Sequence, residues 1–398
     1  MIRSLAIPLI LGCIWDSDTI DDELRGVPDG LTLVTGRWYR HTSAYYEKRI
    51  AELPGRLAAR PDDFEAYDDL AVAWERTGHR DRAIEVMERK RQALDRHDSP
   101  EHRYRYHANL GTFLAHAGRL SEGLVEIERA LALNPSAHFG REHYQVDLIR
   151  YLIAVKSAPE LWKMHDALSY AGYRYRSTSR RSVTLPAYTG QSEGRLEVAW
   201  NGAYTAIGSI LRYGGTEGAE LYRILGDLFA ENGDLNLSWW AFQHALEKKH
   251  PASEVIQTRV SEIETFWQRS GYRSIPTLEL YRAARIEADR WASTFGAVED
   301  EALIRGESPG QTEILRSITE EADRRVPRAL ALRSPTLTQN LGFGLVAAMS
   351  ALGVGIGSGV WMSLRGRRRP GNRPRPRAAR RSAISPLFRR TGGGASLP

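Results

Sequence analysis

The stretch Gly190-Gln-Ser192-Glu-Gly194 has the residue types and spacing of a nucleophilic serine. In a hydrolase, G-x-S-x-G exposes the serine on a strained turn between a strand and a helix. Pro186 breaks the candidate strand before this stretch, and no parallel-sheet pattern surrounds it. Because patterns of this looseness arise by chance, an enzyme that uses Ser192 is the alternative hypothesis and not the first one.

Other residues able to support catalysis or metal binding are scattered. The single cysteine, Cys13, excludes a CxxC metal site, and none of the eleven histidines belongs to an HExxH motif. Asp62, Asp63, Asp68 and Asp69 are typical of a solvated helix start rather than of a calcium loop. The sequence therefore predicts no catalytic residue, no metal and no cofactor, and we expect no enzymatic activity.

Three windows of the chain repeat one order of apolar and small residues, at 64–97, 104–137 and 219–252. In the first window, Tyr67, Leu70 and Trp74 share one face of a helix. Ala71 on that face leaves room for a second helix, and Gly78 ends the first one. Each window is therefore predicted to form a helical hairpin.

The windows resemble the tetratricopeptide repeat (TPR), a helical hairpin of about 34 residues. The chain departs from the family at Gly123 and Ser238, where the family prefers alanine, and at Lys90, where it prefers a small residue. The resemblance implies an all-α, TPR-like solenoid of helical hairpins over residues 36–300, with degenerate hairpins between the second and third windows. A basic loop at 173–195 is expected to interrupt it, and residues 301–335 to form a helical linker.

The resemblance also implies a concave groove that binds a protein or peptide partner without catalysis. Counted along the repeat, the groove positions are Glu65, Asp68, Val72, Glu75, Arg105, Ala108, Thr112, His116, Glu220, Arg223, Asp227 and Glu231. Their acidic bias favours a cationic or mixed-charge peptide, although a solvated face explains each charge as well. Asp68 and Val72 replace the lysine and asparagine of carboxylate-clamping repeats, which argues against recognition of a chaperone C-terminus.

The stretch from Gly36 to Ile50 precedes the first window and is rich in aromatic residues. Together with residues 138–142, it is similar to segments that accompany these repeats in uncharacterised bacterial proteins. His41, Tyr45, Tyr46 and Arg49 in this stretch have two interpretations. They cap the exposed end of the first repeat, which we favour, or they line a ligand groove.

The N-terminus has the features of a secretory signal peptide. Residues 1–12 combine one arginine with an apolar run and a small residue before Cys13. Ile10-Leu11-Gly12-Cys13 resembles a bacterial lipobox, and this resemblance implies lipid attachment at Cys13. The alternative is an ordinary buried cysteine. Residues 13–35, which are rich in aspartate, are expected to form a solvated tether.

Residues 341–364 carry no charge and are long enough to cross a bilayer as one helix, which predicts a C-terminal transmembrane helix. A buried glycine-rich helix is the alternative. Four glycines in this stretch have the small-xxx-small spacing that favours self-association of membrane helices: Gly353, Gly355, Gly357 and Gly359.

Residues 365–398 are predicted to be an arginine-rich, disordered tail. Eleven arginines and no acid between 365 and 390 explain the net charge of +6 and leave about −5 on the rest of the chain. The positive-inside rule places the tail in the cytoplasm and the body on the periplasmic side of a bacterial cell membrane. We expect the tail to contact anionic lipids rather than nucleic acid, unless it is only a stop-transfer signal. Without export, the chain would be a cytosolic, tail-anchored adaptor.

Overall fold

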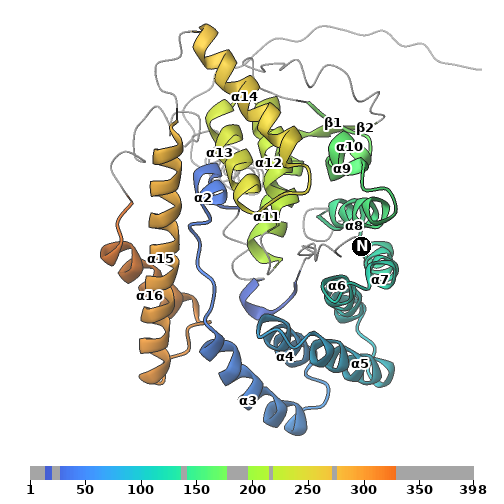
Figure 1. Ribbon diagram of the computed structural model, residues 1–398. Helices are drawn as coiled ribbons and strands as arrows, with labels where there is room; N and C mark the ends of the chain where they lie inside the picture. Colours follow the sequence, from blue (N-terminus) through green and yellow to red (C-terminus); the bar gives the residue numbers. More distant parts are fainter. Residues whose placement is uncertain are drawn as a thin grey trace, which may run out of the picture. The chain divides into compact units, whose positions relative to one another are not determined.

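The computed structural model describes residues 14–19, 27–135, 141–176, 196–214, 218–270 and 276–328. Apart from two short strands, the regular structure in these ranges is helical (Figure 1). The helices are α2 (Gly30–Thr35), α3 (Ser43–Ala59), α4 (Phe64–Arg76), α5 (Arg80–Arg96), α6 (Pro100–His116), α7 (Leu120–Leu133), α8 (Arg141–Ser157), α9 (Leu161–Met164), α10 (Ala167–Tyr170), α11 (Trp200–Tyr213), α12 (Ala219–Glu231), α13 (Leu235–Glu247), α14 (Ser253–Ser270), α15 (Leu278–Ile304) and α16 (Thr312–Arg325).

Consecutive helices pack as hairpins in all three repeat windows: α4 with α5, α6 with α7, and α12 with α13. The same turn closes each hairpin. Gly78, Gly118 and Gly233 adopt the left-handed conformation, with φ of 85°, 83° and 80°. Because only glycine adopts this conformation without strain, the three glycines end the first helix of each pair at the same place.

Close helix packing explains one departure from the repeat pattern. A Cβ on Gly123 of α7 would lie 2.7 Å from the carbonyl oxygen of Gly111 on α6, and a Cβ on Gly111 would lie 2.9 Å from the carbonyl oxygen of Gly123. Both positions therefore need glycine, since each Cβ would meet a backbone carbonyl oxygen, which cannot move away as the end of a side chain can. The crossing of α6 and α7 depends on this pair.

The hydrophobic core follows the hairpins. One cluster joins α3 to α6, and a larger one joins the helices from α7 to α14 with α2. Leu110, Leu114, Leu225 and Phe229 are buried, as their place in the windows predicts. Trp74 is only partly buried and packs at the edge of the first cluster.

The predicted fold class is wrong as stated, because it included a C-terminal transmembrane helix. Among the described residues, no helix has both the length and the apolar composition needed to cross a membrane. The longest, α15, has 27 residues but carries charged side chains along its whole length. The predicted span at 341–364, its four spaced glycines and the arginine-rich tail lie outside the described residues, as do Cys13 and Ser192.

A short sheet also stands where the prediction had only helices and a loop. Strand β1 (Tyr173–Arg176) pairs in parallel with β2 (Leu196–Ala199). Tyr173 faces Leu196 in the register, and Arg176 faces Ala199. The alternating Tyr-Arg-Tyr-Arg of β1 has the period of two that is typical of a strand. The first residues of the expected basic loop therefore belong to a sheet.

Two segments that we expected to lie outside the packed body are part of it. Residues 14–19 and α2 come from the expected tether at 13–35, and all six residues of α2 are buried. Helix α16, from the expected linker at 301–335, packs on α15 through Leu315, Ile318 and Ala322. Helix α15 itself contacts α2 and α3.

Candidate functional site

Residues 14–19, called here the N-terminal segment, lie against α3, α4 and α6. Asn109 of α6 holds the backbone of Trp15 with both ends of its amide. Its Oδ1 accepts from the Trp15 N–H at 2.7 Å, and its Nδ2 donates to the Trp15 carbonyl at 2.9 Å. A side-chain amide that pairs with both the N–H and the carbonyl of one residue makes the hydrogen bonds that a neighbouring strand would make. Asn109 therefore binds the backbone of this residue and does not depend on which side chain the residue carries.

The first two side chains of the segment are held by apolar and aromatic groups. Ile14 is fully buried in the core cluster formed by α3 to α6. The Trp15 ring meets the Tyr104 ring edge to face, at 5.5 Å between centroids. The Arg105 guanidinium lies 5.2 Å from the centre of the Trp15 ring, within the range of a cation–π interaction.

The next residues form a single helical turn whose polar groups are satisfied by carboxylates. Asp16 caps this turn, because its Oδ1 accepts from the N–H and the hydroxyl of Thr19 at 2.8 and 2.6 Å. Ser17 donates its backbone N–H and its hydroxyl to Oδ1 of Asp69 on α4, at 2.9 and 2.8 Å. Asp69 therefore favours a residue at this position that offers it both a backbone N–H and a small side chain with a hydroxyl group.

Asp18 points at two residues of α3. The Tyr45 hydroxyl donates to its Oδ2 at 2.6 Å, and Nη2 of Arg49 donates to its Oδ1 at 2.9 Å. Nη1 of Arg49 also lies 3.8 Å from Asp16 and 3.7 Å from Asp69, so one guanidinium balances three carboxylates. Burial, followed by the charge of Asp16, nevertheless raises the pKa of Asp18 to about 6.

His41 connects this group to α15. Its ring stacks on Tyr45 at 4.0 Å, its Nε2 lies 3.8 Å from Asp18, and its Nδ1 lies 2.5 Å from Glu299. The other oxygen of Glu299 accepts from the backbone N–H of Thr42 at 2.6 Å, at the N-cap of α3. The start of α3 is thereby fixed to α15.

The structure brings together three of the four residues considered for capping or for lining a groove. His41, Tyr45 and Arg49 surround Asp18 of the N-terminal segment, whereas Tyr46 is buried beside Ala73 of α4. Because α3 also packs along α4, this stretch covers the first hairpin and contacts the N-terminal segment at the same time. Capping of the first hairpin and contact with a ligand segment are therefore roles of the same surface.

A buried ion pair between Lys90 and Asp68 supports Asn109, the residue that holds the Trp15 backbone. Nζ of Lys90 donates to both oxygens of Asp68 at 2.6 Å, and Nδ2 of Asn109 donates to Asp68 at 3.0 Å. Lys90 is 0 % exposed and Asp68 is 2 % exposed. This contact explains why a long side chain stands at a position where a small one was expected. Asp68 thus orients Asn109 rather than facing a ligand.

The predicted groove residues on α4 and α6 are mostly engaged inside the body. Glu75 accepts from His116 at 2.7 Å, Thr112 accepts from Gln145 at 3.0 Å, and Val72 is buried. Of this set, Arg105 contacts the N-terminal segment directly, whereas Glu65 is exposed.

The predicted groove residues of the third window do not join this site. Oε2 of Glu220 lies 2.7 Å from His250, and Arg223 donates to the Trp162 carbonyl at 2.8 Å. Asp227 lies 3.3 Å from Arg259 of α14, and Glu231 is half-buried. Neighbouring segments of the body therefore occupy the face that was expected to be open.

Sequence reasoning missed the residues that hold the segment most directly. Asn109 and Asp69 each follow a predicted groove position, Ala108 and Asp68, by one residue. One residue turns a helix face by about 100°, so the counting along the repeat was off by a fraction of a turn. An asparagine inside the apolar run of α6 was the available signal.

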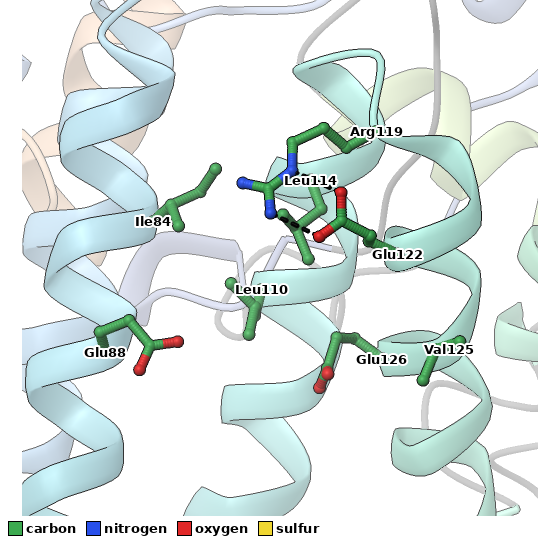
Figure 2. Close-up of a pocket in the computed structure, with 8 residues that line it drawn as sticks. All are labelled: Ile84, Glu88, Leu110, Leu114, Arg119, Glu122, Val125 and Glu126. Carbon is green, nitrogen blue, oxygen red and sulfur yellow. Dashed lines mark hydrogen bonds and ion pairs between the residues drawn. The ribbon is translucent and has the colours of Figure 1, made fainter.

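Apart from the site of the N-terminal segment, a hollow of about 280 Å³ lies between α5, α6 and α7 (Figure 2). Leu110 and Leu114 line it, and its rim carries Glu88, Glu122 and Arg119. The Arg119 guanidinium points at Glu122, with Nε at 2.8 Å from the carboxylate. Because these rim charges pair locally, the hollow shows no unbalanced charge for a ligand.

Within the described ranges, no cluster of histidine, cysteine and acidic residues has the arrangement of a metal site. Comparison with known proteins gives no assignment: no protein-family model matches the chain, and no curated protein is significantly similar to it. The N-terminal segment and its contacts are therefore the functional information that this structure offers.

Proposed function

We propose that this protein is a TPR-like scaffold that binds a short peptide segment of a protein partner on the face formed by α3, α4 and α6. One observation carries the proposal. The N-terminal segment already lies on this face as a peptide would, with its backbone held by Asn109 and its side chains held by separate groups. Side-chain clamps on the backbone combined with separate side-chain contacts are typical of peptide recognition.

The three matching hairpins support the repeat interpretation. Their turns share a left-handed glycine at the same position, and the first helices of the first two hairpins, α4 and α6, supply Asp69 and Asn109, which bind the segment. Stacked hairpins offer a rigid surface for a linear segment, which is the usual role of such repeats. We propose binding rather than catalysis, because the polar side chains of this face, Tyr45, Arg49, Asp69 and Asn109, are used to hold the segment.

Placement is a separate part of the proposal. Cys13 directly precedes the N-terminal segment in the sequence, and we propose that it carries a lipid on the outer side of a bacterial cell membrane. Incorporation of labelled palmitate in cells, abolished by Cys13→Ser, would support this attachment. Absence of label in the wild type would contradict it without affecting the peptide-binding proposal.

A peptide library displayed on phage and selected on the full-length chain tests the binding function. We expect enriched peptides that lose at least tenfold in affinity with Asn109→Ala, because the backbone clamp is removed. Asn134→Ala changes an exposed asparagine at the end of α7 and serves as the matched control. Enriched peptides that bind Asn109→Ala and the wild type equally would contradict the proposed face, provided that circular dichroism shows both variants folded.

A further inference from the structure

We infer that the partner segment is acidic and contains an aromatic residue, with the pattern apolar–Trp–Asp–Ser–Asp, and that residues 14–19 of this chain occupy its place until it binds. This inference rests on the proposed function and adds the chemistry of the partner. It follows from the contacts of each side chain of the N-terminal segment.

The aromatic position is the most selective one. Trp15 lies between the edge of Tyr104 and the guanidinium of Arg105, and both contacts need a flat, electron-rich ring. The residue before it, Ile14, enters the apolar core between α3 and α6. An apolar residue followed by tryptophan satisfies both positions.

Hydrogen-bond donors select a carboxyl side chain after the aromatic residue. Arg49 and the Tyr45 hydroxyl donate to Asp18, and these two donors point into the place that an acid at this position occupies. A lysine there would place its ammonium beside the guanidinium of Arg49 and could not accept from the Tyr45 hydroxyl. The acidic ligand is the opposite of the cationic one that the groove composition suggests.

The carboxylates around the segment do not weaken this argument, because each already has a partner in the body. Asp69 lies 3.7 Å from the Arg49 guanidinium, Glu299 accepts from the Thr42 N–H, and Asp68 accepts from Lys90. None is left to attract a cationic side chain. Asp69 instead selects serine, whose short hydroxyl reaches it at 2.8 Å.

The segment is built to be replaced. Ile14 anchors it in the core cluster, but the rest is a single turn held mainly by polar contacts, in which Ser17 is exposed and Trp15 is only half-buried. Because the segment belongs to the same chain, it competes at a high effective concentration, which lowers the apparent affinity for any partner. A partner with the same pattern therefore binds weakly until the internal copy is displaced.

A labelled synthetic peptide with the sequence of residues 14–19 tests the inference against full-length protein by fluorescence anisotropy. Trp15→Ala weakens the internal copy, so we expect this variant to bind the peptide at least tenfold more tightly than the wild type does. Asp18→Ala is a second way to weaken the internal copy and should give the same direction of change. Adding Asn109→Ala to Trp15→Ala should abolish binding.

Peptide variants test the chemistry. Replacing the peptide's tryptophan by alanine, or its second aspartate by lysine, should reduce binding to the Trp15→Ala protein at least tenfold. Equal affinity of wild type and both segment variants would overturn the inference, while library peptides sensitive to Asn109→Ala would still support the proposed function. A wild type that is dimeric by light scattering, and monomeric as Trp15→Ala, would assign the site to a second copy and also overturn it.

Discussion

Two parts of the N-terminal region, the N-terminal segment and helix α2, pack against the helical body. Their contacts differ in chemistry. Apart from Ile14, which is buried in the core, the N-terminal segment meets α3, α4 and α6 mainly through hydrogen bonds, ion pairs and one cation–π contact. Helix α2 contacts α11, α13 and α15 mainly through apolar side chains, while His244 and Arg285 donate to its carbonyls. Polar contacts are exchanged with water or with another ligand at a small net cost, whereas exposing apolar surface costs free energy in proportion to its area.

The α2 contact is tightly packed. Leu31, Leu33 and Val34 belong to the large core cluster. A Cβ on Gly30 would lie 2.6 Å from the Leu237 side chain and 3.0 Å from the ring of Phe229, so the backbone of α2 approaches its neighbours closely. Helix α2 is therefore a permanent part of the core, and the N-terminal segment is the replaceable one.

Lys90→Met should have the largest effect, because it removes the support of the polar site. It leaves the buried carboxylate of Asp68 without its partner, and we expect a loss of about 3 to 5 kcal/mol in the free energy of unfolding. Urea denaturation measures it. Asp68→Leu combined with Lys90→Met should recover most of the loss, and Lys156→Met, at an exposed position, is the control. A single variant as stable as the wild type would contradict a charged pair.

Leu33→Ala tests the apolar side of the comparison. Leu33 is 0 % exposed, and its truncation should cost about 2 to 5 kcal/mol in the free energy of unfolding. Hydrogen exchange should show lost protection in α2, α11 and α13. Leu133→Ala, at 48 % exposure, is the matched control and should change stability by about 0.5 kcal/mol or less. Unchanged protection in α2 would mean that both contacts are replaceable.

A decrease in pH should act on the α2 side through His244 of α13. Its Nδ1 donates to the Val34 carbonyl at 2.8 Å, and burial, followed by the charge of Arg285, lowers its pKa well below the usual value. Lys248 and Arg40 face it as well. Because the unfolded chain takes up a proton that the folded chain does not, stability is complete above about pH 6.5 and falls by about 1.4 kcal/mol per pH unit below it.

Thermal unfolding between pH 7 and pH 5 measures this effect, with His244→Gln as the comparison variant. The His244→Gln protein should lose less stability than the wild type over that range. His97, which ends α5 at an exposed position, provides the control variant His97→Gln. Equal losses in wild type and His244→Gln would assign the pH dependence to other groups.

The N-terminal segment should respond to pH in the opposite direction, and with the smallest effect. The folded-state pKa of Asp18 is raised to about 6, so docking is favoured at low pH and weakens as the pH rises through 6. The groups facing Asp18 are Asp16, His41, Tyr45 and Arg49. We expect docking to weaken about tenfold between pH 5 and pH 7.

Hydrogen exchange of residues 14–19 in the full chain, after correction for the intrinsic pH dependence of exchange, measures this change. Asp18→Asn should remove most of it, because the amide does not titrate in this range. If both residues 14–19 and α2 lost protection from exchange as the pH fell, the two contacts would not be independent of each other.

The hairpins were predictable because their signals are local. Gly78, Gly118 and Gly233 each end a helix at a spacing that the sequence displays, and the apolar faces of Leu110 and Leu225 follow from helical periodicity. The N-terminal segment was not predictable in this way. Its aspartates were interpreted as solvated, because Arg49, Asp69 and Asn109, which pair with the segment, lie far along the chain and reach it only in the folded body.

The contact of α15 with α3 has a consequence for synthesis of the chain. Glu299 binds His41 and the cap of α3 across a sequence separation of 258 residues. A protein emerges from the ribosome N-terminus first, and contacts of such long separation form late. The first hairpins can assemble early, since their partners are local, but the cover over Asp18 is completed only after α15 has been translated. During that interval the start of α3 lacks its contact with α15, so Asp18 is held by α3 alone in the nascent chain.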